Sequence, residues 1–281
     1  MPFYPLSLRH PLGFQWKLDS REALWAYLSS CESFTTKVVI EIAPQIETSI
    51  CIGANRGWYP LVIRKMNSTC EIHAFEPNSK TYSLLEGNLR ANSAVVHSHN
   101  FALGKSSSLR DIYIYENAND GMTTLYPTST IADSFAKLET IRVKTLDEVF
   151  SHAKQLSGPI LLQMDIEGAE YEALLGSTQF LKKYSPIVIC EINPLLLVAA
   201  GGSSFELFHL MESLGYVIYW IDERGKLWLQ REDDPCGHLE FLPPGSGSNY
   251  IFLKDSAFEG ELISRLVASS QFVPNLQKKY R

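Results

Sequence analysis

Residues 48–77 read TSICIGANRGWYPLVIRKMNSTCEIHAFEP, and the order of residue types in this stretch decides the fold. An apolar run, Ile50–Ile52, enters a glycine-bearing turn, and a helix-like segment follows from Trp58 to Met66. A second short apolar run, Ile72–Phe75, ends on an acid, Glu76. Strand, tight turn, helix, strand and acid, in this order, form the first half of a nucleotide-binding βαβ unit.

The spacing of the glycines in the turn distinguishes between classes of cofactor. Gly53 and Gly57 permit the backbone angles of the turn and bring main-chain N–H groups close to a ligand. Glu76 lies 23 residues after Gly53, near the spacing of roughly 20 at which an acid meets ribose hydroxyls. Asn55 stands where a dinucleotide fingerprint has its middle glycine, and no third glycine follows. The turn therefore has less room for a pyrophosphate and suits S-adenosylmethionine, although an ordinary strand-to-helix turn stays an alternative.

The length, composition and net charge of the chain limit the classes of protein to which it can belong. A chain of 281 residues with 45% hydrophobic residues fits one α/β domain with additions. A net charge of −6 disfavours nucleic acid or an anionic membrane as the main partner. No apolar stretch is long enough to span a bilayer, and no signal peptide is recognisable. We therefore expect a cytoplasmic protein with no membrane partner.

Cysteines and histidines are the residues that most often bind metals. The five cysteines have no metal-type spacing, and free buried thiols in a reducing compartment account for them. His97 and His99 alternate on an expected strand, so both would face one side. They could form a metal pair or, more simply, face solvent. The sequence predicts no metal site.

Hydrophobic patterns predict the order of elements along the chain. Further strands are expected at 37–42, 95–103, 109–115 (as an edge strand), 141–145, 160–164, 186–192, 216–221, 227–230 and 250–254. Further helices are expected at 19–28, 78–92, 146–153, 170–175 and 204–214, with a final helix after 255. Residues 117–133 are expected to form a loop, and residues 232–248 are long enough to form a lid.

Polar side chains follow five successive strands of the expected sheet, where a ligand of an open α/β sheet would lie. They are residues 51–57, 76–78 and 100–102, then Asp165 and Glu167, then Glu191 and Asn193. Several have structural alternatives: Asp165 could cap a helix, and Asn193 could only form a turn. Glu170, in a first helical turn, is expected to interact with the helix dipole or with solvent.

The sequence motifs resemble those of the FkbM family of S-adenosylmethionine-dependent methyltransferases. They are C-I-G-A-N-R-G-W-Y, A-F-E-P-N, L-x-x-N-L, L-D-E, M-D-I-E-G-A-E-Y-x-x-L-x-G and P-I-V-I-C-E-I, which occur in that order between residues 48 and 193. The resemblance implies an α/β, Rossmann-like class I methyltransferase fold: a seven-stranded, mostly parallel sheet with helices on both faces. It also implies methyl transfer to a hydroxyl, usually of a saccharide or natural product. To this fold we add an N-terminal helical lead-in and a small β insert.

Two positions depart from the family pattern. The family usually has an acid at the position of Cys51 and a lysine at the position of Gln163. A cysteine at its normal pKa is neutral at pH 7 and does not replace the charge of the acid. A non-catalytic relative that serves as a binding or scaffolding protein is therefore one alternative function.

The prediction is a methyltransferase domain over residues 48–255, with a lead-in at 1–47 and a C-terminal helix and tail at 256–281. The expected general base is Glu167, with Asp165 and Glu191 as further catalytic candidates. Asp165, Glu191 and Asn193 could instead bind Mg²⁺ in a metal-assisted enzyme. The residues expected to contact S-adenosyl-L-methionine are Cys51, Gly53, Ala54, Asn55, Gly57, Tyr59, Glu76, Pro77, Asn78, Phe101, Ala102 and Asp165. The expected partner is a small-molecule or saccharide acceptor whose identity the sequence does not reveal.

Overall fold

The structure, a computed structural model, describes residues 6–29, 33–115, 123–127, 136–151, 156–230 and 247–254. Outside these residues lie most of the expected lid, the expected C-terminal helix, the end of the helix expected at 146–153 and most of the loop expected at 117–133. The domain boundaries stay predictions. None of the described helices is both long enough and apolar enough to cross a membrane.

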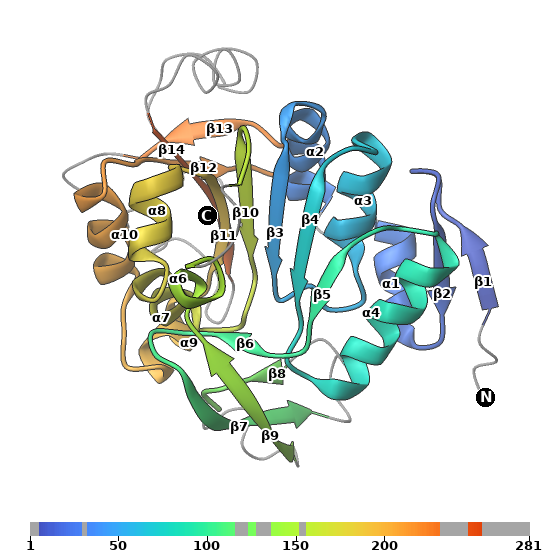
Figure 1. The fold of residues 1–281 in the computed structure, drawn as a ribbon, viewed down its shortest axis with the longest axis horizontal. Coiled ribbons are helices and arrows are strands. Elements are labelled where there is room, and N and C mark those ends of the chain that lie inside the picture. Colours follow the sequence, from blue (N-terminus) through green and yellow to red (C-terminus); the bar gives the residue numbers. More distant parts are fainter. Residues whose placement is uncertain are drawn as a thin grey trace, which may run out of the picture.

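The main sheet has eight strands in the order β13-β12-β14-β11-β10-β3-β4-β5 (Figure 1). They are β3 (Thr48–Ile52), β4 (Glu71–Phe75), β5 (His97–His99), β10 (Ile160–Met164), β11 (Ile187–Ile192), β12 (Val217–Ile221), β13 (Leu227–Leu229) and β14 (Ser248–Leu253). Neighbours from β5 to β11 are parallel, whereas β14 runs antiparallel to β11 and β12. The predicted fold class is confirmed, and β13 adds an eighth strand to the seven expected.

Helices cover both faces of this sheet because the central strands are buried on both sides. Every residue of β3 and β10 is buried. Alternate residues enter opposite cores: Cys51 packs on one face, and its neighbours Ile50 and Ile52 pack on the other. The first face is covered by α2 (Ser33–Ile42), α3 (Trp58–Met66) and α4 (Ser79–Ala91). The second is covered by α6 (Leu146–Val149), α7 (Glu170–Leu175), α8 (Thr178–Tyr184) and α10 (Ser204–Ser213), and α9 (Pro194–Ala199) also contributes.

The N-terminal segment differs from the prediction at two points. The helix expected from residue 19 or 20 is present as α1 (Arg21–Ser29), but a hairpin of β1 (Leu6–Arg9) and β2 (Gln15–Leu18) precedes it. Residues 37–42, predicted as a strand, are the second half of α2. The prediction was wrong because β-branched composition was given more weight than period: the buried positions of α2 recur at helical spacing.

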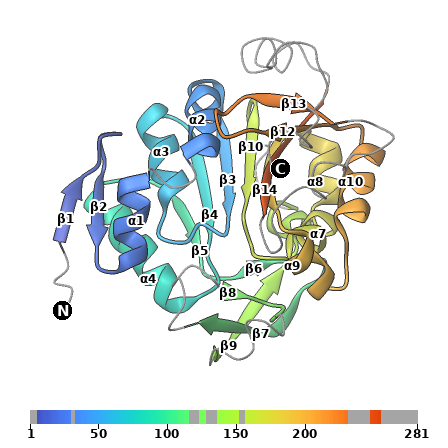
Figure 2. The same ribbon diagram turned by 180° about the vertical axis from the view of Figure 1, so that it is seen from behind.

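An aromatic cluster joins the hairpin to the start of α3. The rings of Phe14 and Trp16 lie edge-on to the Trp58 indole at centroid distances of 5.4 and 5.5 Å. The Trp58 Nε1–H donates to Thr36 Oγ1 of α2 at 3.0 Å. The hairpin strand β2 also contacts α1 and α4 (Figure 2). Offset and edge-on aromatic pairs stabilise by about 0.5–1.5 kcal/mol each beyond the area they bury.

A second sheet of four strands, in the order β6-β9-β7-β8, lies between β5 and β10 in the sequence. Its strands are β6 (Ala102–Leu103), β7 (Ser108–Tyr115), β8 (Thr123–Thr124) and β9 (Ala136–Lys144). The single strand predicted at 95–103 was wrong, because β5 ends at His99 and β6 begins the second sheet. Residues 109–115 do form a strand, β7, but the prediction that it is an edge strand was wrong. It pairs with β9 on one side and with β8 on the other.

A charged network connects the second sheet to α7. The Glu172 carboxylate accepts hydrogen bonds from Arg110 of β7 at 2.9 Å and from the Tyr126 hydroxyl at 2.5 Å, and it pairs with Lys105 at 2.7 Å. Burial by itself would raise the pKa of Glu172, but Lys105, Tyr126 and Arg110 together lower it below its ordinary value. The carboxylate therefore binds its proton more weakly in the folded chain than in the unfolded chain.

Glu172→Gln should lower the free energy of unfolding by about 1–3 kcal/mol at pH 7, since it leaves two cations without their shared partner. A lowered pKa in the folded state gives stability above the pKa of an unfolded glutamate, about 4.3, that is lost as the pH falls further. The difference between parent and variant should therefore shrink below pH ~4 in denaturant titrations. Glu41→Gln, at an exposed position of α2, is the control, and an equal loss there would contradict a specific role for Glu172.

Candidate functional site

The turn after β3 is held against two neighbouring strand ends. The N–H groups of Gly53 and Ala54 both donate to the Phe75 carbonyl, at 3.0 and 2.9 Å. Gly53 has a φ of 77°, and a Cβ there would lie 1.9 Å from the carbonyl oxygen of Asp165. Only glycine fits this position, since a side chain would push β3 and β10 apart.

The Glu76 carboxylate bridges the turn and the segment after β4. One oxygen accepts the Asn55 N–H at 3.0 Å, and the other accepts the Asn78 N–H at 2.9 Å. The residue is only 6% exposed. Because each carboxylate oxygen has two acceptor positions, this geometry is compatible with ribose hydroxyls binding to the same group. The sequence prediction for Glu76 is therefore consistent with its position.

Asparagines hold the backbone around Glu76. The Asn100 side chain donates to the carbonyls of Glu76 and Pro77 at 2.9 and 3.0 Å. Asn78 caps α4, because its side-chain oxygen accepts the N–H groups of Lys80 and Thr81. Its position supports a structural role at least as well as the predicted contact with a cofactor. Asn100 was predicted at a strand end, but its clamp on two carbonyls has no signature in the sequence.

Other residues predicted to contact the cofactor differ in their surroundings. The half-buried Phe101 lies in the chain between the end of β5 and the start of β6. Its ring lies edge-on to that of Phe75, at a centroid distance of 5.4 Å. Ala102 begins β6 and is mostly buried. Tyr59 is buried in the core that also holds Trp58. The structure thus places Phe101 beside Glu76 and its neighbours, whereas Tyr59 belongs to the packing of α3.

The two residues that depart from the family pattern are direct neighbours. Cys51 of β3 and Gln163 of β10 are partners in the parallel ladder, so their side chains leave the same face of the sheet. Both are at most 3% exposed. Burial raises the pKa of Cys51 to about 12, so the thiol is neutral at pH 7. Among the described residues, no hydrogen-bond donor reaches Gln163 Oε1. A neutral pair thus occupies two adjacent positions at which the family usually has opposite charges.

The loop between β10 and α7 is held from inside by Glu170. Its carboxylate accepts the N–H of Ile166 at 3.1 Å and that of Gly168 at 3.1 and 3.0 Å, and the residue is 2% exposed. Burial raises the pKa of Glu170, and these N–H donors oppose the shift. Glu170 lies in the first turn of α7, as expected, but the interpretation as a residue that faces solvent was wrong. Glu170 resembles the glutamate of a capping box, because it follows the loop by a few residues and reaches back to the N–H groups of the loop. This spacing is the feature of the sequence that could have indicated its role.

Glu167, the expected base, lies at the tip of this loop. Its φ is 53°, in the left-handed region that non-glycine residues seldom adopt. The Thr124 hydroxyl of β8 donates to its carbonyl at 2.8 Å, and Asn78 Nδ2 contacts Thr123 at 3.4 Å. The second sheet thereby contacts the ends of both β4 and β10. Sequence reasoning did not identify Thr124.

Carboxylates gather at the ends of β10 and β11. Asp165 and Glu191 follow the ladder partners Met164 and Cys190 by one residue each, so they lie at the same level. The negative charges of Glu170, Asp165 and Glu191 add to burial in raising the pKa of the Cys190 thiol. Glu191 pairs with Asn249 of β14, and its Oε1 is so near Gly247 that a Cβ there would lie 2.4 Å away. Gly247 belongs to the expected lid, but the sequence did not indicate that it and Asn249 lie beside Glu191.

Asn193 is one of the three residues that could bind Mg²⁺ if the enzyme were metal-assisted. Its side-chain oxygen accepts the N–H groups of Leu195 and Leu196, at 3.1 and 3.5 Å, and so caps α9. An oxygen used in a helix cap is a poor third ligand for Mg²⁺. The turn-forming interpretation of Asn193 fits the structure better.

Comparison with known proteins agrees with this arrangement. The family model described as "Methyltransferase FkbM domain" matches residues 52–218, more than half of the chain. The chain belongs to the FkbM methyltransferase family. The resemblance inferred from the motifs is thereby confirmed, and the FkbM match extends past Asn193 to include α10 and the start of β12.

Individual relatives of this FkbM protein are distant. "Methyltransferase 1" of Beauveria bassiana (strain ARSEF 2860) is 25% identical over 154 residues, which are 48% of this chain and 61% of that protein. The FkbM methyltransferase of Methylobacillus flagellatus KT has a TM-score of 0.44 and 14% identity, over 74% of this chain and 43% of that one. An S-adenosylmethionine-dependent O-methyltransferase of Thermotoga maritima has a TM-score of 0.41 and 10% identity, over 90% and 78% of the two chains.

The neutral pair generates a double-mutant prediction. Cys51→Asp and Gln163→Lys each bury one unpaired charge and should lower the free energy of unfolding by about 3–5 kcal/mol. The double variant places opposite charges on ladder partners, so its loss should be smaller than the sum by at least about 1 kcal/mol. Denaturant titrations of the four proteins measure this coupling. Strictly additive losses would show that the two side chains do not interact.

Proposed function

We propose that this protein is an S-adenosylmethionine-dependent O-methyltransferase that acts on a hydroxyl of a saccharide or natural-product small molecule. Membership of the FkbM methyltransferase family supports methyl transfer with S-adenosyl-L-methionine as the cofactor. The observation that carries the finer proposal is the contact between Gly53 and Asp165. It brings the segment that follows β10 and carries Asp165 beside the turn in which the cofactor would bind, and Glu191 lies on the neighbouring strand β11.

Residues of this chain fit the cofactor at both of its ends. Glu76 would accept the ribose hydroxyls, and Phe101 would contribute an apolar surface near them. The backbone of the turn from Gly53 to Gly57 would hold the amino-acid moiety. Bound S-adenosylmethionine supplies an activated methyl group on a positively charged sulfur.

Glu167 is the proposed general base, with Asp165 and Glu191 beside it. The cofactor would supply its methyl group to the acceptor oxygen, and the electron pair of the methyl–sulfur bond would stay on the cofactor sulfur. The acceptor proton passes to the carboxylate. Positioning supplies much of the rate in such an in-line reaction. Glu170 and Thr124 position the loop that carries Glu167, so we assign them a positioning role.

A second candidate is a relative that binds without turnover, and the neutral pair of Cys51 and Gln163 is the observation that favours it. Without the usual acid, the floor of the turn lacks a charge for the methionine end of the cofactor. Cys51 is nevertheless part of the packed core, so its thiol leaves the shape of the turn intact. Because the Glu76 carboxylate still meets this turn, we favour the enzyme and assign most of the cofactor affinity to Glu76.

Glu76→Gln should weaken binding of S-adenosylhomocysteine by about tenfold or more, equivalent to about 1.5 kcal/mol for a charge-assisted hydrogen bond. Titration calorimetry measures the change, and thermal melts check that the bridge between Asn55 and Asn78 has survived. Glu41→Gln serves as the control. Unchanged affinity in a folded Glu76 variant would remove this residue from the ribose site.

Glu167→Gln should lower turnover by roughly 10²-fold or more while leaving cofactor affinity nearly intact, since the amide keeps the volume of the side chain but does not take a proton. Asp165→Asn should also weaken binding, because Asp165 lies closer to the turn. If Glu167→Gln turns over like the parent and Glu191→Gln is inactive, Glu191 is the base instead.

The assay needs an acceptor, which a screen with methyl-labelled S-adenosylmethionine would identify. Saccharides and hydroxylated natural products form the main panel, and an RNA fraction tests the expectation that nucleic acid is not the partner. Label transferred to RNA alone would contradict the proposed substrate class. Cofactor binding without transfer to any class would favour the non-catalytic candidate.

A further inference from the structure

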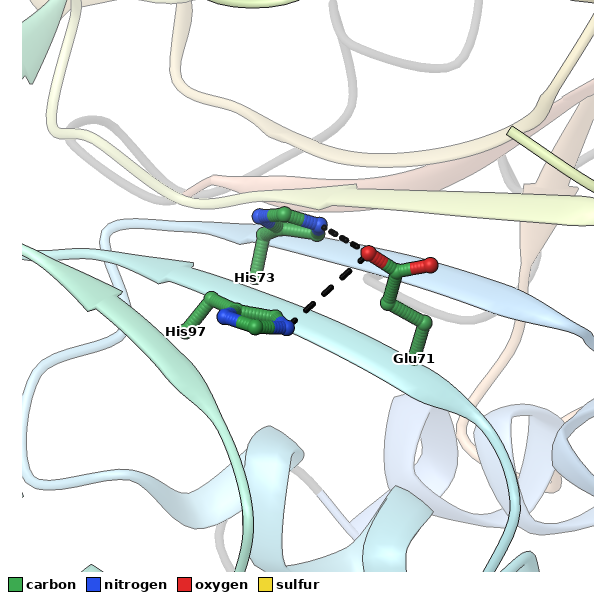
Figure 3. Close-up of side chains that lie close together, drawn as sticks. All are labelled: Glu71, His73 and His97. Carbon is green, nitrogen blue, oxygen red and sulfur yellow. Dashed lines mark hydrogen bonds and ion pairs between the residues drawn. The ribbon is translucent and has the colours of Figure 1, made fainter. Parts of the chain in front are cut away.

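Three side chains converge on one face of the edge pair β4–β5, away from the cofactor turn (Figure 3). His73 and His97 are partners in the parallel ladder, and Glu71 begins β4 two residues before His73. Glu71 Oε1 lies 3.2 Å from His73 Nε2 and 3.9 Å from His97 Nε2. Neither helix capping nor the sheet ladder requires these residue types at these positions.

The distances among the three ligand atoms suit a small metal ion. All three atoms lie within 4.8 Å of one another. Zinc bonds of about 2.0–2.2 Å at tetrahedral angles place neighbouring ligand atoms about 3.3–3.5 Å apart. The distance of 3.2 Å between Glu71 and His73 is already close to this value, and the distance of 3.9 Å between Glu71 and His97 would need to shorten by about 0.5 Å. Since no two of the atoms are farther apart than 4.8 Å, the remaining pair would need to close by at most about 1.4 Å. The side chains of Glu71 and His97 are the exposed ones, at 46% and 58%, whereas that of His73 is 12% exposed.

A third histidine holds the ring of His73 in the orientation that ligation needs. His99 Nε2 lies 3.3 Å from His73 Nδ1, so Nδ1 can donate to His99 while Nε2 faces Glu71 and His97. Hydrogen bonds of this kind to the second ring nitrogen are general features of metal-bound histidines. Phe150 lies edge-on to His73 at 5.0 Å, and Phe75 stacks on His99 at 4.4 Å.

We propose that Glu71, His73 and His97 bind one divalent transition-metal ion of the zinc class, with water in the fourth position. The two-histidine, one-carboxylate set matches the nitrogen and oxygen ligands that zinc takes. The partner of His97 in this set is His73, which faces it across two strands, and not His99, the other histidine of β5. Because Glu71 begins β4 and the cofactor turn follows the carboxyl ends of the strands, the ion joins β5 to β4 and takes no part in methyl transfer.

Zinc titration of the untagged, chelator-treated full chain tests the site, followed by calorimetry or a competing chromophoric chelator. One ion per chain should bind with a Kd at or below about 1 μM. His97→Ala and Glu71→Gln, both at exposed positions, should weaken binding by about tenfold or more. His99→Ala should weaken it by about 10-fold, as loss of an outer partner does. His209→Ala, at an exposed position of α10, should leave binding unchanged.

Cobalt(II) provides a second readout that does not depend on affinity. A four-coordinate site should give intense visible absorption bands that disappear in His97→Ala but persist in His209→Ala. Absence of stoichiometric zinc binding to the parent would overturn the proposal. Equal affinity of the parent, His97→Ala and Glu71→Gln proteins would overturn it too, since the ion would then bind elsewhere.

Discussion

The geometry of the candidate site depends on the absence of a side chain at Gly53. With a Cβ only 1.9 Å from the Asp165 carbonyl, any other residue would separate the ends of β3 and β10. The turn could then no longer meet Phe75, and Glu76 could no longer reach the Asn55 N–H. This one close approach of two backbones sets the position of the cofactor turn. It also sets the positions of the acid after β4 and of the carboxylates after β10.

The floor of the site shows how a family pattern can change without breaking the fold. Two adjacent ladder positions, Cys51 and Gln163, are both neutral, so neither leaves an unpaired charge in the core. Changing only one of the usual residues would have left a buried charge alone, at a cost of several kcal/mol. The fold therefore accommodates the two neutral residues together more easily than it would accommodate either one alone. At Cys51, packing of the thiol replaces a charged contact.

Much of the central domain could be predicted from the sequence because its signals are local. The turn at Gly53, the start of α3 at Trp58 and the buried strand at Ile160 depend on residues close together in the chain. The helix α2 was missed because its β-branched residues suggest a strand while their spacing indicates a helix. The roles of Asn100 and Thr124 depend on backbone groups that only folding brings near, and no periodicity records them. Glu170 differs, because the N–H groups that it accepts are close to it in the sequence. The cluster around His73 was missed because ladder register, not sequence spacing, brings His97 beside it.

The aromatic cluster at the start of α3 limits how the catalytic unit can be transferred between proteins. Phe14 and Trp16 lie before the segment that defines the family, yet their rings fix the first residue of the helix that follows the cofactor turn. Arg56, inside the turn, is likewise paired with Asp19. A chimera cut at the family boundary would carry the turn without the rings that set its direction. The N-terminal hairpin thus supports the turn of the candidate site, and its sequence should vary in step with that of the turn.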